Sequence, residues 1–213
     1  GIVTLDQNPS AIMAGMLSAN RGFVANNQGR VWVTSSPRQD PVLTIDDSLL
    51  RGGFEYRHTN PKQQLLNKVR TRFIAPAREY NTADGPILVD DDYQDEDGET
   101  LEATVNLPYT LHHARAQRLA KLYMEESRVQ GGLTANLPVR LLGLMPGKIV
   151  NVSSGIYPFM DGQYRVEQIG LTEDFSLMPV TLTRHDATIA DQWVAATDEQ
   201  DFTIADISAE SPD

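Results

Sequence analysis

The side chains most suggestive of chemistry form a run of carboxylates from Asp90 to Glu99. Carboxylate oxygens are ligands that calcium prefers. The spacing does not fit the best-known calcium loop, because aligning Gly98 with the required glycine of that loop places Tyr93 at the first ligand position. Runs of like charge usually lie in water, so the sequence favours a solvated acidic loop over a cation site.

Histidine and serine supply the other reactive side chains. His112 and His113 are adjacent at the start of a predicted helix, where neighbouring side chains point about 100° apart and cannot face one ion together. Ser35-Ser36 and Ser153-Ser154 do not lie in a nucleophile-elbow pattern. Arg51-Gly52-Gly53 lacks the lysine and spacing of a phosphate-binding loop, which favours a turn. The sequence therefore predicts no catalytic, cofactor-binding or metal-binding residue, no cofactor, and a protein that is not an enzyme.

Aromatic side chains raise the possibility of sugar binding, because their faces stack on pyranose rings. The two tryptophans are Trp32, which falls within a strand pattern, and Trp193, which follows a helix-like turn. These settings favour packing in a core or an interface over an exposed sugar platform.

The composition narrows the class of protein. The 213 residues are enough for one domain or two small ones, and 40% hydrophobic with 22% charged residues is typical of a globular protein. No apolar run approaches the roughly 20 residues of a membrane span, and the chain has 0 cysteines, which excludes disulfides and thiolate chemistry. The net charge of -11 argues against binding to nucleic acid, which depends on neutralised phosphates.

The spacing of hydrophobic residues and the positions of capping and turn residues predict an α+β, predominantly β protein with two helices. Asn8 and Pro9 begin a short N-terminal helix, about 9–21, and Thr110 begins one long helix, about 110–130, with Ala116, Leu119, Ala120 and Tyr123 as its buried stripe. The predicted strands, from alternation and apolar runs between turn residues, are 23–25, 30–34, 41–45, 54–58, 68–74, 87–89, 104–107, 133–137, 139–144, 148–152, 163–171 and 178–184.

The same patterns predict that the chain is divided into a subdomain, a domain and a linker. Residues 1–50 are expected to form a helix plus hairpin subdomain completed by chain outside this sequence, 51–194 a β-rich domain with the long helix, and 195–213 an acidic polar linker. Because the sequence begins with Gly1 and ends in a polar run, we expect it to be a fragment of a longer protein.

A family resemblance rests on motifs between Thr44 and Trp193. These motifs are Leu49-Leu50-Arg51-Gly52-Gly53-Phe54-Glu55-Tyr56, the stretch from Asn67 to Pro76, the acidic run from Asp90 to Glu99, Leu107-Pro108-Tyr109-Thr110 before Ala114, Arg115 and Ala116, and the stretches 137–144, 147–152, 163–166 and 179–186. In order and spacing they resemble the phage tail-protein family that includes the tip-attachment protein of lambda-like phages and the hub of gene-transfer-agent particles. His185 stands where the family tends to carry Glu.

This resemblance implies a structural role at the end of a phage tail. It implies a hub-type β-barrel or sandwich domain in a homotrimeric ring that joins the tail tube to host-recognition parts and lets DNA pass. The implied partners are other copies of the chain and other tail proteins: tail tube or distal tail, tape measure and fibres. A host receptor would be reached through other segments, and the protein would be assembled in the bacterial host cytoplasm. We expect the isolated chain to be monomeric or weakly associated. A receptor- or carbohydrate-binding module is the alternative, and a cell-wall hydrolase is less favoured.

Overall fold

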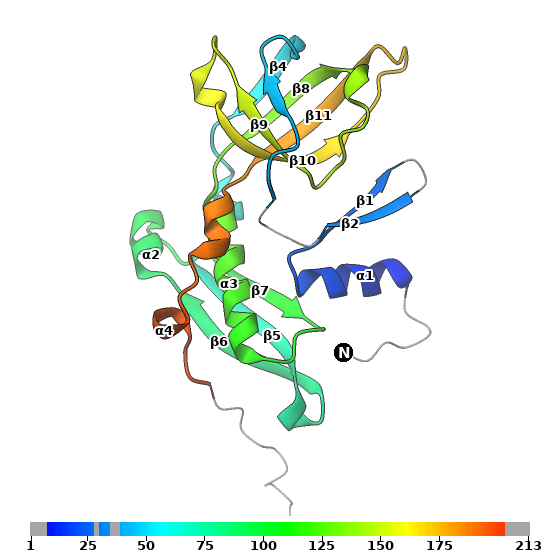
Figure 1. Ribbon diagram of the computed structural model, residues 1–213. Helices are drawn as coiled ribbons and strands as arrows, with labels where there is room; N and C mark the ends of the chain where they lie inside the picture. The colour runs from blue at the N-terminus through cyan, green and yellow to red at the C-terminus, as the bar shows by residue number, and fades with distance from the viewer. Residues whose placement is uncertain (1–7, 28–29, 35–38, 203–213) are drawn as a thin grey trace, which may run out of the picture. The chain divides into compact units, whose positions relative to one another are not determined.

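The computed structural model describes residues 8–27, 30–34 and 39–202 of the chain. The chain forms two compact units, each assembled from segments that are distant in the sequence (Figure 1). Unit 1 comprises residues 1–22, 63–128 and 189–213, and unit 2 comprises residues 23–62 and 129–188. The expected segments 1–50 and 51–194 thus each contribute to both units, and their independence as folding segments stays a prediction. The expected α+β, predominantly β class is confirmed.

Unit 1 is a small sheet with helices packed on it. Its elements are α1 (Pro9–Ser18), β5 (Lys68–Ala75), η2 (Pro76–Arg78), β6 (Asn81–Val89), α2 (Asp91–Asp97), β7 (Glu102–Leu107), α3 (His113–Arg128), η5 (Ala187–Asp191, shared with unit 2) and α4 (Ala195–Asp198). The strand order is β6-β5-β7, with β5 antiparallel to β6 and parallel to β7. The central strand alternates strictly, so Val69, Thr71 and Phe73 are buried on one face as the sequence predicts.

Helix α3 covers the buried face of this sheet (Figure 1). The predicted stripe is confirmed at Ala116, Leu119 and Ala120, which are all buried. Tyr123 is only half-buried, and its ring instead carries the Arg21 guanidinium 3.8 Å from its centroid. The helix is shorter than 110–130 because its first turn opens at His112, whose carbonyl accepts from the Ala116 amide.

Helix α1 begins at the predicted capping residue, Asn8, and at Pro9. The Asn8 side chain accepts a hydrogen bond from the Ser10 amide at 3.0 Å, and Pro9 occupies the first helical position. The helix ends at Ser18 and not near residue 21, because the Gly22 amide donates to the Leu17 carbonyl and turns the chain away.

Unit 2 is almost entirely β. Its elements are β1 (Phe23–Asn27), β2 (Arg30–Thr34), β3 (Thr44–Asp46), β4 (Arg51–Arg57), β8 (Gly132–Pro138), η3 (Val139–Leu141), β9 (Ile149–Ser153), η4 (Pro158–Met160), β10 (Gly162–Ile169) and β11 (Leu177–Arg184), and η1 (Lys62–Gln64) lies where the two units meet in sequence. Strands β1 and β2 form the predicted hairpin, and the other strands form a six-stranded sheet in the order β3-β9-β10-β11-β8-β4. Pairing is antiparallel except between β3 and β9.

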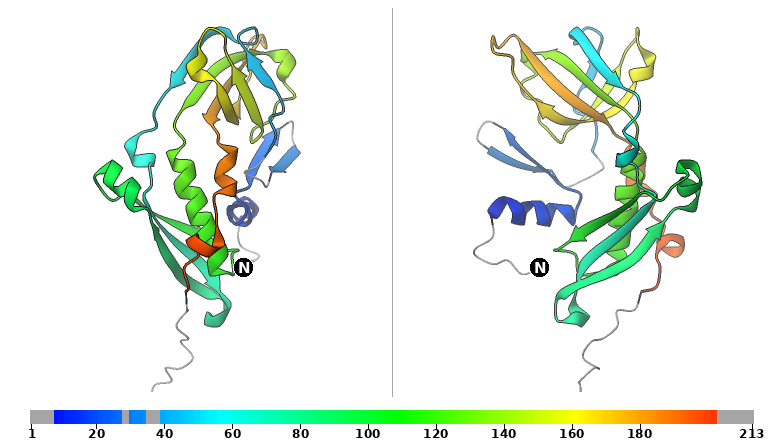
Figure 2. Two further views of the ribbon diagram at one scale, coloured as in Figure 1. Left: turned by 60° about the vertical axis from the view of Figure 1, so that its left-hand side comes forward. Right: turned by 180° about the vertical axis from the view of Figure 1, so that it is seen from behind.

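The six-stranded sheet curls into an open half-barrel (Figure 2). Its two edge strands, β3 and β4, are joined by residues 47–50 alone. A flat sheet of six strands is about 24 Å wide, at about 4.8 Å for each strand pair. Five peptide steps span about 18 Å at most. The short connection therefore requires the sheet to bend until its edges approach.

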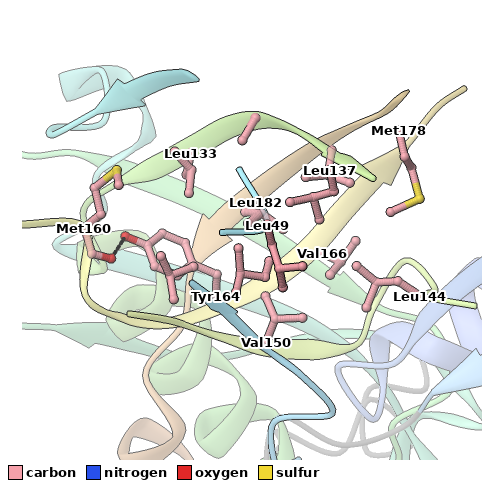
Figure 3. Close-up of a cluster of buried hydrophobic side chains, with 14 residues drawn as sticks. Leu49, Leu133, Leu137, Leu144, Val150, Met160, Tyr164, Val166, Met178 and Leu182 are labelled. Carbon is pink, nitrogen blue, oxygen red and sulfur yellow. Dashed lines mark hydrogen bonds between the residues drawn. The ribbon is translucent and has the colours of Figure 1, made fainter. Parts of the chain in front are cut away.

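The concave side of this sheet holds the core of unit 2. Figure 3 shows Leu133, Leu137, Val166 and Leu182 within one apolar cluster. Tyr164 is fully buried among them, and its hydroxyl donates to the Met160 carbonyl at 2.8 Å. Because the one polar atom of that ring has a partner, a phenol can occupy an otherwise apolar core.

Two local predictions in unit 2 are wrong. Residues 139–144 are not a strand but the η3 turn and a bend, because β8 ends at Pro138 and Leu144 folds back into the core. Arg51-Gly52-Gly53 is not a turn but the start of β4, where Gly52 has a φ of 69° and the pairing with β8 shifts between Arg51 and Phe54. A positive φ at glycine beside an extra residue is the geometry of a β-bulge.

Candidate interaction surface

An aromatic cluster stands at the surface of unit 2. It consists of Phe54 and Tyr56 from β4 and Tyr157 and Phe159 from the connection between β9 and β10. Ring centroids lie 5.0 Å apart for Phe54 and Tyr157 and 5.1 Å apart for Tyr56 and Phe159, with interplanar angles of 68° and 55°. These are edge-to-face and tilted contacts, the arrangement that aromatic quadrupoles favour.

Half of this aromatic cluster is exposed. Tyr157 retains 39% and Phe159 54% of their accessible surface, and the neighbouring Ile156 is more exposed still. Phe54 and Tyr56 are half-buried and pack against the core of unit 2. The cluster thus joins an anchored inner pair of rings to an outer pair that is available for contact.

Hydrogen bonds fix the segment that carries the outer rings. The Asp47 carboxylate accepts from the Ser154 hydroxyl and, at 2.8 Å, from the Gly155 amide. The Ser154 amide donates to the Asp161 carboxylate at 2.7 Å, and the Ser154 hydroxyl accepts from the Tyr157 amide at 2.8 Å. Both ends of the segment are therefore tied down, which lowers the entropy lost when its side chains bind a partner.

The base of the cluster is equally ordered. The Tyr56 hydroxyl donates to the Phe159 carbonyl at 3.3 Å, and Arg184 donates to the Asp161 carbonyl at 2.9 Å. Burial, followed by the nearby Tyr56, raises the pKa of Tyr164 to about 12, so its hydroxyl remains a donor throughout neutral pH. Rigid, partly exposed aromatic rings on such a base are typical of binding surfaces.

The acidic run from Asp90 to Glu99 is not the predicted solvated loop. It forms helix α2, with the Asp90 side chain accepting from the Tyr93 amide at 3.0 Å and Gly98 ending the helix at a φ of 69°. Asp97 faces inward and forms a two-point ion pair with Arg128. The carboxylate at the end of the run thus serves packing between α2 and α3.

Other residues singled out in the sequence have separate surroundings. His112 is exposed. His113 is half-buried, and its Nδ1 atom lies 3.4 Å from the side-chain Nε2 atom of Gln117. Ser154 belongs to the network below the aromatic cluster, whereas Ser35-Ser36 lies outside the described residues. Within residues 8–27, 30–34 and 39–202, no group of three or more His, Asp or Glu residues is placed to hold a metal ion.

The tryptophans do not share a site. Trp32 lies in β2 as predicted but is not in a core, since 44% of its surface is exposed. Trp193 is half-buried after η5. The aromatic cluster could not be predicted from the sequence, because its rings come from segments about one hundred residues apart. None of the helices in the described part of the chain is long and apolar enough to cross a membrane.

Two solved structures share this fold. A chain from the virion of a native gene transfer agent particle superposes with a TM-score of 0.69 at 18% identity, over 88% of this chain and 41% of that chain. The 43 kDa tail protein of prophage MuSo2 from Shewanella oneidensis superposes with a TM-score of 0.52 at 12% identity, over 87% of this chain and 56% of that chain. The present chain thus spans about two fifths to just over half of these structures.

The sequence itself defines the family. A profile of the family described as "Putative phage tail protein" matches residues 11–169, and the chain belongs to that family. The family expected from the motifs is confirmed, and the chain is a structural component of a phage tail. No curated protein sequence matches it significantly.

Proposed function

We propose that this chain is a hub or tip-attachment component at the distal end of the tail. In this role it forms a homotrimeric ring that joins the tail tube to the host-recognition parts and leaves a passage for DNA. Other tail proteins bind it, it carries no catalytic residues, and it is assembled in the host cytoplasm before it joins the virion.

The family match over residues 11–169 carries this proposal. The shared fold with a chain of the gene-transfer-agent virion supports a place within a particle. The net charge of -11 is compatible with a passage for DNA, because like charge keeps a polyanion from adhering to the wall.

The position in the particle can be tested by labelling. The turn between β10 and β11 is exposed at Glu173 and Phe175, so a short epitope inserted after Glu173 leaves the core of unit 2 intact. We expect immunogold particles at the distal tail end of purified virions, with untagged virions as the control. Label along the tube or at the junction with the head would contradict the proposal.

The exposed rings of the aromatic cluster favour one alternative, a receptor- or carbohydrate-binding module. If that function holds, the protein binds a defined glycan on an array, and replacing Tyr157 and Phe159 with Ala weakens binding by about tenfold or more. Phe175→Ala is the matched control, because Phe175 is an exposed aromatic outside the cluster. An array without signal, or equal losses in the two variants, would remove this alternative.

A further inference from the structure

The β1–β2 hairpin exposes more apolar surface than its two strands can cover. Val31, Trp32 and Val33 retain 57%, 44% and 55% of their accessible surface. Val24 lies opposite Val33, so these two residues and Val31 share one face, whereas the alternation of the strand turns Trp32 to the other face. Each face of the hairpin therefore exposes at least one apolar side chain.

The hairpin also has free edges. In the described part of the chain, β1 and β2 pair only with each other. A two-stranded ribbon is at best marginally stable in water, and stability normally needs a third strand or a packed face. Unpaired strand edges beside exposed valines are the feature to which another strand adds.

Charge indicates what completes the hairpin. Residues 23–34, which form it, hold 1 arginine, Arg30, and no Asp or Glu. The remaining 17 of the 18 basic residues and all 29 acidic residues lie elsewhere in the chain. The hairpin segment is thus the part that a second, strongly acidic copy can approach with attraction instead of repulsion.

We propose that the β1–β2 hairpin docks on the acidic body of a second copy of this chain. The contact is head-to-tail, because the basic apolar hairpin of one copy meets a different, acidic surface of the next. Head-to-tail contacts close into rings when the rotation permits. The inference rests on the proposed ring, because it assigns the surface by which neighbouring copies hold one another.

Sedimentation velocity over a range of protein concentration and salt tests this inference. The wild-type chain is expected to associate weakly, and less strongly as salt screens the attraction between the hairpin and the acidic surface. A variant with Val31→Asp and Val33→Asp is expected to raise the dissociation constant at least about tenfold. A variant with Leu171→Asp and Phe175→Asp is the control, because it adds the same two charges at exposed apolar positions outside both the hairpin and the aromatic cluster.

Trp32 provides a readout at the hairpin itself. The chain has 2 tryptophans, so Trp193→Phe leaves Trp32 as the only indole. Its emission is expected to shift to shorter wavelength as association buries the ring, with no shift in the background of the Val31 and Val33 variant. Circular dichroism of each variant separates a lost contact from a lost fold.

The outcomes distinguish the inference from the proposed ring. Association that the hairpin variant abolishes, but with a stoichiometry other than three, supports the hairpin contact and contradicts the trimer. A trimer that the hairpin variant leaves intact, or that the control variant weakens equally, overturns the hairpin contact alone. A wild-type chain that is monomeric at every concentration and salt also overturns it.

Discussion

Replacing Asp97 with Ala is expected to lower the free energy of unfolding by about 3–5 kcal/mol, the range for removing one partner of a buried ion pair. The side chains of Asp97 and Arg128 are only 5% and 14% exposed. The Arg128 guanidinium donates to both carboxylate oxygens, and its central carbon lies 4.2 Å from the centroid of the Tyr93 ring. The Asn67 amide also donates to the Asp97 carboxylate, at 2.7 Å. Without the carboxylate, the Arg128 guanidinium keeps its hydrogen bond to the Leu66 carbonyl and the Asn67 amide keeps its bond to the Glu99 carbonyl, but each loses its charged acceptor.

Chemical denaturation followed by circular dichroism measures this loss. Asp95→Ala is the matched control, because Asp95 is an exposed acid of the same helix. It is expected to change stability by no more than about 0.5 kcal/mol, as surface substitutions usually do. Equal losses for Asp95→Ala and Asp97→Ala would show that the ion pair does not hold α2 against α3.

The acidic run from Asp90 to Glu99 carries local helix signals, but its packing depends on a residue that is distant in the sequence. The N-cap Asp90 and the terminating Gly98 were both visible, and Asp91 and Asp92 in the first turn favour a helix through its dipole. The charge density nevertheless favoured a solvated loop. What the sequence could not show was Arg128, which lies 31 residues from Asp97 along the chain and faces it only in the folded unit.

Most helices and strands could be predicted from local sequence patterns. The features that could not be predicted depend on contacts between residues that are distant in the sequence. Three features depend on residues that are close in the sequence and could therefore be predicted: the alternation along β5, the β1–β2 hairpin and the buried stripe on α3. The division into two units depends on pairings such as β4 with β8, about eighty residues apart, which no local pattern encodes. The aromatic cluster was missed for the same reason, since its rings meet only when the sheet curls.

Replacing Leu119 with Ala is expected to destabilise the protein by about 2–5 kcal/mol, the range for large-to-small changes in a packed core. Leu119 is 5% exposed and lies on the face of α3 that also buries Ala116 and Ala120. Helix α3 packs on β5 and β6, and a lost side chain on its buried face leaves a cavity that the surrounding elements cannot fill without moving. Alanine preserves helix propensity, so the loss reports packing and not helix formation.

The control for this change must come from the exposed face of α3. Glu126 is unsuitable, although its place on the helix suggests a solvated position, because its carboxylate forms an ion pair with Arg21. Arg118→Ala is preferable, since Arg118 is exposed and its one described hydrogen bond, to the Ala190 carbonyl, is long at 3.5 Å. Thermal and denaturant melts should show a large loss for Leu119→Ala and a change within about 0.5 kcal/mol for Arg118→Ala. Similar losses in both variants would mean that the buried face of α3 has been assigned to the wrong side of the helix.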